Sequence, residues 1–271
     1  MSDQATAPPG QASRRRRDRS QRLAPAREVL PAFRLPWGPL DAFTPEDARR
    51  IADTAYLVLE ELGLEIRSAR ARALYRAAGC LVDDETQIVR IGRDVVDGCL
   101  AHAPRRFVLH ARDPARHLRF GEGMSYATTV HGAPHVSDAA GGRRYATIGD
   151  LRDILKATYA MGVAHFRPGV VVEPMDLPVP TRHLDIYRAQ IEIADTLWCA
   201  RGVGRAQAED AIRLSAIEHG ASVEDLAARP TLMTVTNVNS PRRVDEEILQ
   251  NVMVMAAHGQ CVCVTPFTLM G

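Results

Sequence analysis

The side chains best suited to chemistry in this sequence follow predicted strands that recur about every 30 residues. They are two carboxylates, two carboxamides and an aromatic ring, namely Glu173, Asp176, Asn237, Asn239 and Phe267. Carboxylates and aromatic faces attract cations, and carboxamides can donate hydrogen bonds to a carboxylate. Because parallel α/β folds bind ligands at the carboxyl ends of their strands, we expect these residues to line a substrate site. No residue of the sequence is assigned a catalytic role.

Each candidate also has a purely structural interpretation. Glu173, the strongest candidate, and Asp176 can cap a helix or form ion pairs in loops. Asn237 and Asn239 can satisfy backbone groups of loops, and Phe267 can belong to the core. The sequence leaves both sets of interpretations open.

Other kinds of chemistry lack their motifs. There is no Gly-x-Ser-x-Gly elbow, and no Gly-x-Gly-x-x-Gly turn follows the first predicted strand. The single lysine, Lys156, disfavours Schiff-base and Walker-type chemistry. Neither the pair His131 and His135 nor the motif His183-x-Asp185 lies on a predicted strand, so we expect no metal site.

The composition is that of a globular protein, with 271 residues of which 46% are hydrophobic. Residues 1–27 carry seven arginines and two aspartates, so the net charge of +1 leaves the remaining residues at −4. We expect a basic, disordered tail over residues 1–27 and no nucleic-acid partner. No apolar stretch indicates a secretory signal or a membrane span. Five cysteines without a Cys-x-x-Cys pair fit a reduced, cytoplasmic chain, with Cys261 and Cys263 as a buried packing pair.

The elements that must position the candidates form two regions, an α+β region over residues 28–150 and a repeating βα region over residues 151–271. In the first region we expect a helix that opens at Thr44 and stops at Gly63, and a hairpin that turns at residues 140–142. In the second we expect strands near 166–172, 196–201, 231–237 and 260–267, with helices near 182–194, 205–219 and 243–258. Repeated βα units predict a parallel sheet, either open or the front part of a barrel.

Several short patterns occur together in one order along the chain. They are Leu62-Gly63-Leu64-Glu65, Ala77-Ala78-Gly79 with Val82-Asp83, Ala111-Arg112-Asp113-Pro114, Gly132-Ala133-Pro134, Arg143-Arg144 with Ala146-Thr147, Glu173-Pro174 with Asp176, Arg229-Pro230, Ser240-Pro241 and the segment 266–271. From about residue 30 onward, this ordered series resembles the trimethylamine methyltransferase family, which includes pyrrolysine-free glycine betaine methyltransferases.

The resemblance implies an α/β fold of the (β/α)₈ TIM-barrel type with an N-terminal α+β extension, of which about the first four βα units are present. It also implies transfer of a methyl group from a tertiary or quaternary amine to the corrinoid of a separate protein, with no cofactor bound directly. Under this hypothesis Glu173 and Asp176 face the ammonium or line the barrel mouth, Asn237 and Asn239 bind a carboxylate or the corrin rim, and Phe267 offers a cation–π face.

The same hypothesis sets the expected partners. They are a cognate corrinoid protein and a small methylated amine, with no nucleic acid and no membrane. We expect a homo-oligomer, because half a barrel leaves strand edges exposed. The alternative function is a non-catalytic half-barrel that acts as an assembly or regulatory partner, and a metal hydrolase is a third, weaker possibility.

Overall fold

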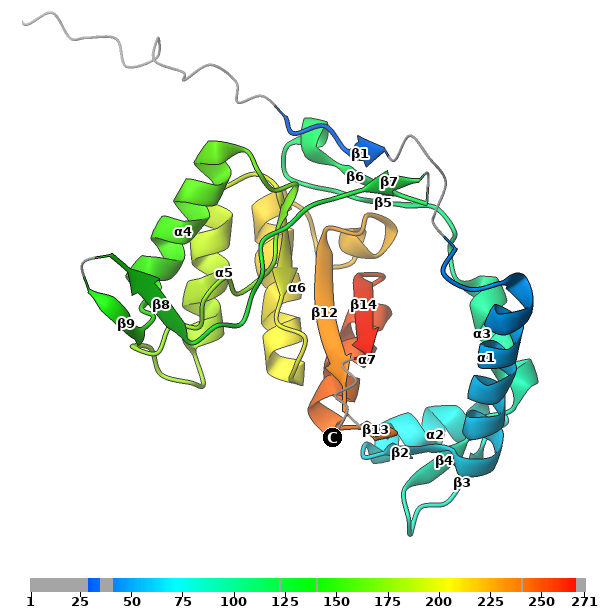
Figure 1. The fold of residues 1–271 in the computed structure, drawn as a ribbon. Coiled ribbons are helices and arrows are strands. Elements are labelled where there is room, and N and C mark those ends of the chain that lie inside the picture. Colours follow the sequence, from blue (N-terminus) through cyan, green and yellow to red (C-terminus); the bar gives the residue numbers. More distant parts are fainter. Residues whose placement is uncertain (1–28, 35–40, 122, 140, 240, 267–271) are drawn as a thin grey trace, which may run out of the picture.

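The computed structural model describes residues 29–34, 41–121, 123–139, 141–239 and 241–266, and it contains several small sheets around one parallel sheet (Figure 1). The tail predicted over residues 1–27 and the candidate Phe267 lie outside the described residues.

The central sheet is parallel and has the strand order β10-β11-β12-β14. Its strands are β10 (Phe166–Arg167), β11 (Leu197–Ala200), β12 (Leu232–Val238) and β14 (Cys261–Pro266). The connecting helices are α5 (Arg182–Ile193), α6 (Arg205–His219) and α7 (Glu246–Ala257), with the short helix η4 (Asp225–Ala228) between α6 and β12. The predicted alternation of strands and helices is confirmed, and the sheet order follows the sequence order.

The two faces of this sheet are covered differently. On one face Trp198 and Leu232 pack against Tyr187, Ile212 and Met255 of the connecting helices, and all five side chains are almost fully buried. In each of these helices, apolar residues at helical spacing form one side, and that side packs against the sheet.

On the other face Leu197, Cys199 and Met233 pack against Leu109 and Leu118. Those two leucines belong to a hairpin of β5 (Phe107–Leu109) and β6 (Leu118–Phe120), and the short helix η3 (Pro114–Arg116) connects its strands. Cys261 and Cys263 also pack on this face, which confirms that the pair packs on one side of the strand, but both are half-buried and not buried as predicted. Burial raises the pKa of Cys261 to about 11, so its thiol stays protonated at neutral pH.

A second, mixed sheet of order β13-β2-β4-β3 joins three strands of the N-terminal region to β13 (Arg243–Val244), which lies between β12 and α7 in the sequence. The elements of this N-terminal unit are α1 (Pro45–Leu57), a π-helical turn (Val58–Leu62), β2 (Leu64–Ile66), α2 (Ala69–Ala77), β3 (Leu81–Val82), β4 (Ile88–Arg90) and α3 (Arg93–His102). Thr44 caps α1 through the backbone N–H of Asp47, as predicted. The helical segment stops at Gly63, whose φ is +68° and whose Cβ position would lie 2.4 Å from the oxygen of Val89, so only glycine fits there.

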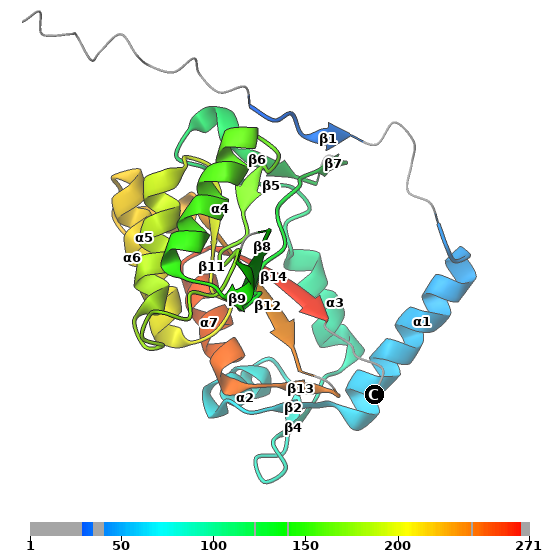
Figure 2. The ribbon, with the colours of Figure 1, turned by 60° about the vertical axis from the view of Figure 1, so that its left-hand side comes forward.

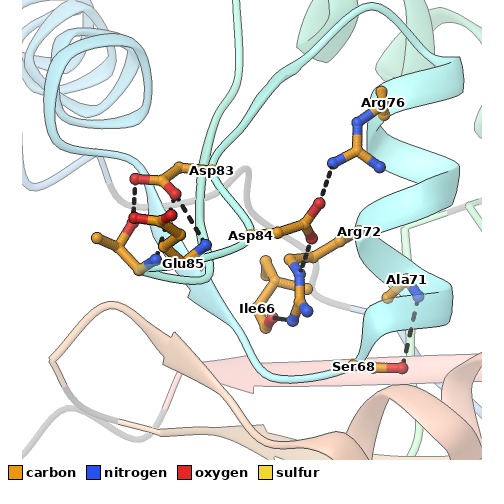
Figure 3. A network of polar contacts seen from close by, with 9 residues as sticks. Ile66, Ser68, Ala71, Arg72, Arg76, Asp83, Asp84 and Glu85 are labelled. Carbon is orange, nitrogen blue, oxygen red and sulfur yellow. Dashed lines mark hydrogen bonds and ion pairs between the residues drawn. The ribbon is translucent and has the colours of Figure 1, made fainter.

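A buried arginine ties α2 to β2 in this unit (Figure 3). Arg72 is 7% exposed and donates from Nη1 to the oxygen of Ile66 at 2.7 Å and from Nε to Asp84 at 2.8 Å. Arg76 donates to the second oxygen of Asp84, while Ser68 caps the start of α2. Strand β2 is therefore held by side chains as well as by its sheet partners.

The remaining elements surround these two sheets (Figure 2). β1 (Phe33–Arg34) pairs with β7 (Met124–Ser125), and β8 (His135–Asp138) forms the predicted hairpin with β9 (Gly142–Tyr145). α4 (Ile148–Met161) opens with a capping box of Thr147 and Asp150. Among the described residues, no helix is both long and apolar enough to cross a membrane.

Candidate functional site

A cavity of about 530 Å³ lies at the carboxyl ends of the parallel strands. Its wall includes three of the predicted residues, Glu173, Asn237 and Asn239, together with Arg201 from the end of β11. Valine and isoleucine side chains supply an apolar part of the wall: Val170, Val203, Val235, Val238 and Ile248. The cavity therefore combines a charged edge with an apolar surface, as small-molecule sites commonly do.

Glu173 is held between two arginines. Its Oε1 accepts hydrogen bonds from Nη1 of Arg182 at 2.9 Å and from Nη1 of Arg201 at 3.0 Å, and its Oε2 accepts from Nη1 of Arg201 at 2.9 Å. The side chains of Glu173, Arg182 and Arg201 are 17%, 10% and 26% exposed. Charge-assisted bonds at such burial are strong, so the carboxylate is an internal partner of the guanidiniums. The structure thus matches the interpretation of Glu173 as a loop ion pair.

The cluster of Glu173, Arg182 and Arg201 carries an excess positive charge. One carboxylate and two guanidiniums leave a net charge of +1 beside the cavity. Beyond Nη1, a guanidinium has three further N–H donors on Nη2 and Nε. The edge of the cavity is therefore suited to a carboxylate more than to a bare cation.

Two fully buried side chains fix the backbone of Arg201. Its N–H donates to the hydroxyl of Tyr187 at 3.0 Å, and its carbonyl accepts from Nδ2 of Asn251 at 2.8 Å. Tyr187 comes from α5 and Asn251 from α7, and burial raises the pKa of Tyr187 so that it stays a neutral hydroxyl. The sequence did not indicate Tyr187, Asn251 or Arg182 as site residues, because in the sequence they lie within helices and do not follow a predicted strand.

Gly202 brings the ends of β11 and β12 together beside Arg201. A Cβ atom at this position would lie 2.2 Å from the carbonyl oxygen of Val235, so a side chain would push the two strands apart. Thr236 closes the contact by donating from Oγ1 to the carbonyl oxygen of Gly202 at 3.0 Å. This close approach shapes the floor of the cavity.

The other predicted residues divide into two groups. Asn237 accepts a hydrogen bond from the hydroxyl of Thr265 and is exposed, and Asn239 accepts from the backbone N–H of Asp245 at 3.3 Å, both within the cavity wall. Asp176 is not part of the wall, because its carboxylate accepts from the first N–H of α4, that of Ile148, at 3.0 Å. Asp176 thus has the alternative role of a helix cap.

The histidines are dispersed. His131 lines the cavity, whereas His135 stacks on Tyr145 with ring centroids 4.6 Å apart. His183 bonds to Asp210 at 2.9 Å in a buried position. Within the part of the chain that the structure describes, no three His, Cys, Asp or Glu residues are grouped so that they could hold a metal ion.

Comparison with known proteins assigns the chain to a family. The family profile described as "Trimethylamine methyltransferase (MTTB)" matches residues 10–271. The chain belongs to the trimethylamine methyltransferase family. This confirms the family that the ordered motifs indicated.

Individual members of the family are similar over different lengths. The glycine betaine methyltransferase of Desulfitobacterium hafniense (strain Y51) is 28% identical over 244 residues, which are 90% of this chain and 49% of that protein. The trimethylamine methyltransferase MttB of Methanosarcina thermophila is 38% identical over 74 residues, which are 27% of this chain and 15% of that protein. The chain therefore spans at most about half the length of these curated relatives.

Proposed function

We propose that this protein takes part in methyl transfer from a quaternary ammonium compound that carries a carboxylate, of the glycine betaine type, to the Co(I) centre of a separate corrinoid protein. The observation that carries the proposal is the position of Arg201 at the cavity of a trimethylamine methyltransferase family member. Trimethylamine itself has no carboxylate to pair with this guanidinium. Among the amines that the names of the relatives print, glycine betaine is therefore the better match.

The chemistry asks little of the protein beyond binding and orientation. When the methyl group leaves a quaternary ammonium, the C–N bonding pair stays on nitrogen and the amine departs neutral, so no general acid is needed. A corrinoid partner, when bound, would supply the nucleophilic Co(I) that accepts the methyl group. The contribution of this chain is to fix the ammonium in one orientation, which can lower a barrier by several kcal/mol.

The cavity provides contacts for both ends of such a substrate. The N–H groups on Nη2 and Nε of Arg201, which bond to no described residue, are suited to the carboxylate together with the carboxamides of Asn237 and Asn239. The apolar wall of Val235, Val238 and Ile248 is suited to the methyl groups of the ammonium. Glu173 then orients Arg201 and partly neutralises it, and we assign it no direct contact with the substrate.

We also propose that the parallel sheet is part of a (β/α)₈ barrel. In the sheet each strand neighbours the next one in sequence, and the connecting helices cover one face while a hairpin covers the other. Both features support a barrel, since doubly wound sheets reverse their strand order and carry helices on both faces.

The cysteines and the edge of the parallel sheet bear on the compartment and the assembly of the protein. We propose a homo-oligomer in the cytoplasm, working with a cognate corrinoid protein that supplies the cofactor. Five free cysteines support a reducing compartment. Within the described residues β14 pairs with β12 alone, and this unpaired second edge supports association with further strands.

The test is methyl transfer to free cob(I)alamin, followed by the change in its absorption spectrum. We expect the protein to use glycine betaine at least about tenfold faster than trimethylamine, a preference that corresponds to about 1.4 kcal/mol. Arg201→Gln should lose this preference, whereas Arg205→Gln, on an exposed helix start, should keep it. Transfer from neither amine, with stable binding to a second protein chain, would favour the alternative of a non-catalytic assembly partner.

A further inference from the structure

The segment between β12 and α7 lines the cavity at one end and contributes a strand to the mixed sheet at the other. Asn239 stands in the cavity wall, and its backbone exchanges two hydrogen bonds with Arg243, N–H to oxygen at 3.0 and 3.5 Å. Arg243 and Val244 form β13 (Arg243–Val244), which pairs in parallel with β2 (Figure 1). The wall of the cavity therefore continues directly into a strand of the other sheet.

Arg242 has a left-handed backbone conformation in this loop. It is the third residue of the turn that joins Asn239 to Arg243, and its φ of +48° lies in the left-handed region where such hairpin turns favour glycine. Its guanidinium Nη1 donates to the carbonyls of Leu62 and Gly63 at 3.1 and 2.9 Å. The contacts of the side chain explain why an arginine stands where the backbone favours glycine.

Glu65 of β2 makes a second connection. Its two oxygens accept from Nε of Arg67 at 2.8 Å and from Nε of Arg243 at 2.9 Å. These hydrogen bonds lower the pKa of Glu65, so the carboxylate stays charged at neutral pH. Arg67 in turn lies 3.4 Å from Asp245, whose N–H donates to the side chain of Asn239. The network thus runs from β2 to the cavity wall through polar contacts alone.

The anchor of this network is itself rigid. The side chain of Ile66 next to Glu65 is fully buried, and its carbonyl is held by the buried Arg72 (Figure 3). A site that is supported by residues of well-packed helices and strands keeps its geometry more precisely than a site on an unsupported loop.

We propose that Arg242 and Glu65 are positioning residues, through which the N-terminal unit holds Asn239 in the wall of the substrate cavity. Neither residue touches the substrate, and each acts through the loop of residues 239–245. The inference rests on the proposed function for its effect on catalysis, but the anchoring of the loop can be measured without it.

The experiment compares Arg242→Gly and Glu65→Gln with Glu61→Gln, which changes an exposed carboxylate in the adjoining π-helical turn. Glycine relieves the left-handed backbone while it removes the guanidinium, so a loss cannot be attributed to strain in the turn. Glu65→Gln keeps the shape of the side chain and removes its charge. The measurements are amide hydrogen exchange over residues 237–245 and steady-state kinetics with glycine betaine.

We expect exchange over residues 237–245 to be at least about fivefold faster in both variants, because the loop then opens locally without global unfolding. The KM for glycine betaine should rise about three- to tenfold with kcat within about twofold, as for a loss of binding geometry. Unchanged exchange in Arg242→Gly and Glu65→Gln would overturn the proposal, and so would changed exchange with an unchanged KM. If the unmodified protein transfers no methyl group, the proposed function fails while the exchange data still decide whether the loop is anchored.

Discussion

Replacing Glu173 by glutamine tests whether this carboxylate is an internal partner of the arginines or a free group for the substrate. The substitution keeps the size of the side chain and removes its charge. Arg182 and Arg201 then lose three charge-assisted hydrogen bonds, and Arg182 remains only 10% exposed. The protein must therefore carry a nearly buried guanidinium without its counterion.

The expected cost follows from the burial of the three groups. Breaking a fully buried ion pair by removing one partner costs about 3–5 kcal/mol. Arg201 is 26% exposed, so water recovers part of that loss, and we expect about 2–4 kcal/mol for the cluster. For a protein of this size, such a loss lowers the melting temperature by roughly 5–15 °C.

The assay is urea unfolding followed by circular dichroism, with Glu209→Gln as the control. Glu209 pairs with Arg205 on an exposed helix surface, where the side chains are 31% and 56% exposed, and its loss should cost less than about 0.5 kcal/mol. A change below about 1 kcal/mol for Glu173→Gln, together with a clear loss of amine binding, would refute the ion-pair interpretation. It would restore Glu173 as a ligand of the ammonium.

Three further predictions concern the surroundings of the site. Asp176→Ala should destabilise the protein by about 0.5–1 kcal/mol in urea unfolding, by removing the acceptor for Ile148, and should leave amine binding unchanged; altered binding would contradict its role as a cap. Burial lowers the pKa of His219 to about 4, so the unfolded state binds a proton first as the pH falls. Stability should decrease by about 1–3 kcal/mol between pH 6.5 and pH 4, and a pH titration of unfolding should show this component absent in His219→Gln. Gly202→Ala should cost about 1–3 kcal/mol, because its Cβ meets a backbone oxygen. By contrast Gly98→Ala, in an open helical position, should stabilise by about 0.5–1 kcal/mol, and equal effects in thermal unfolding would argue against the close approach.

The sequence predicted the regular elements of the parallel sheet well, because their signals are local. The helix expected over residues 205–219 is observed as α6 with the same bounds, and the helix capped by Thr44 starts as expected. The first strand is shorter than the predicted 166–172 and ends at Arg167. Gly169, with φ of +91°, turns the chain there, and Val170 then bonds to Gly132 of the preceding region.

The pairing of strands that lie far apart in the sequence could not be predicted from local sequence patterns. Residues 243–244 were predicted as the start of a helix, but they form β13 beside β2, about 180 residues earlier in the chain, and α7 starts at Glu246. No local pattern marks a strand of two residues whose partner lies so far away. The division of the chain into residues 28–150 and 151–271 stays a prediction.

The candidate site was predicted in part. Glu173, Asn237 and Asn239 were found because strand ends converge in a parallel sheet, and the structure brings them to one cavity. Arg182 and Asn251 were missed, because the direction of a helical side chain toward the strand ends depends on how the helices pack. The charge of Arg201 was not weighed as a substrate contact, although its place after a predicted strand was the available signal.

Recognition of a carboxylate by Arg201 is tested most directly by calorimetric titration of the protein and of its Arg201→Gln variant with glycine betaine and with tetramethylammonium. We expect the protein to bind glycine betaine at least about tenfold more tightly than tetramethylammonium, and Arg201→Gln to remove most of this difference. Equal affinities for the two ligands, or a preference that survives in Arg201→Gln, would contradict the claim that the cavity recognises a carboxylate through Arg201.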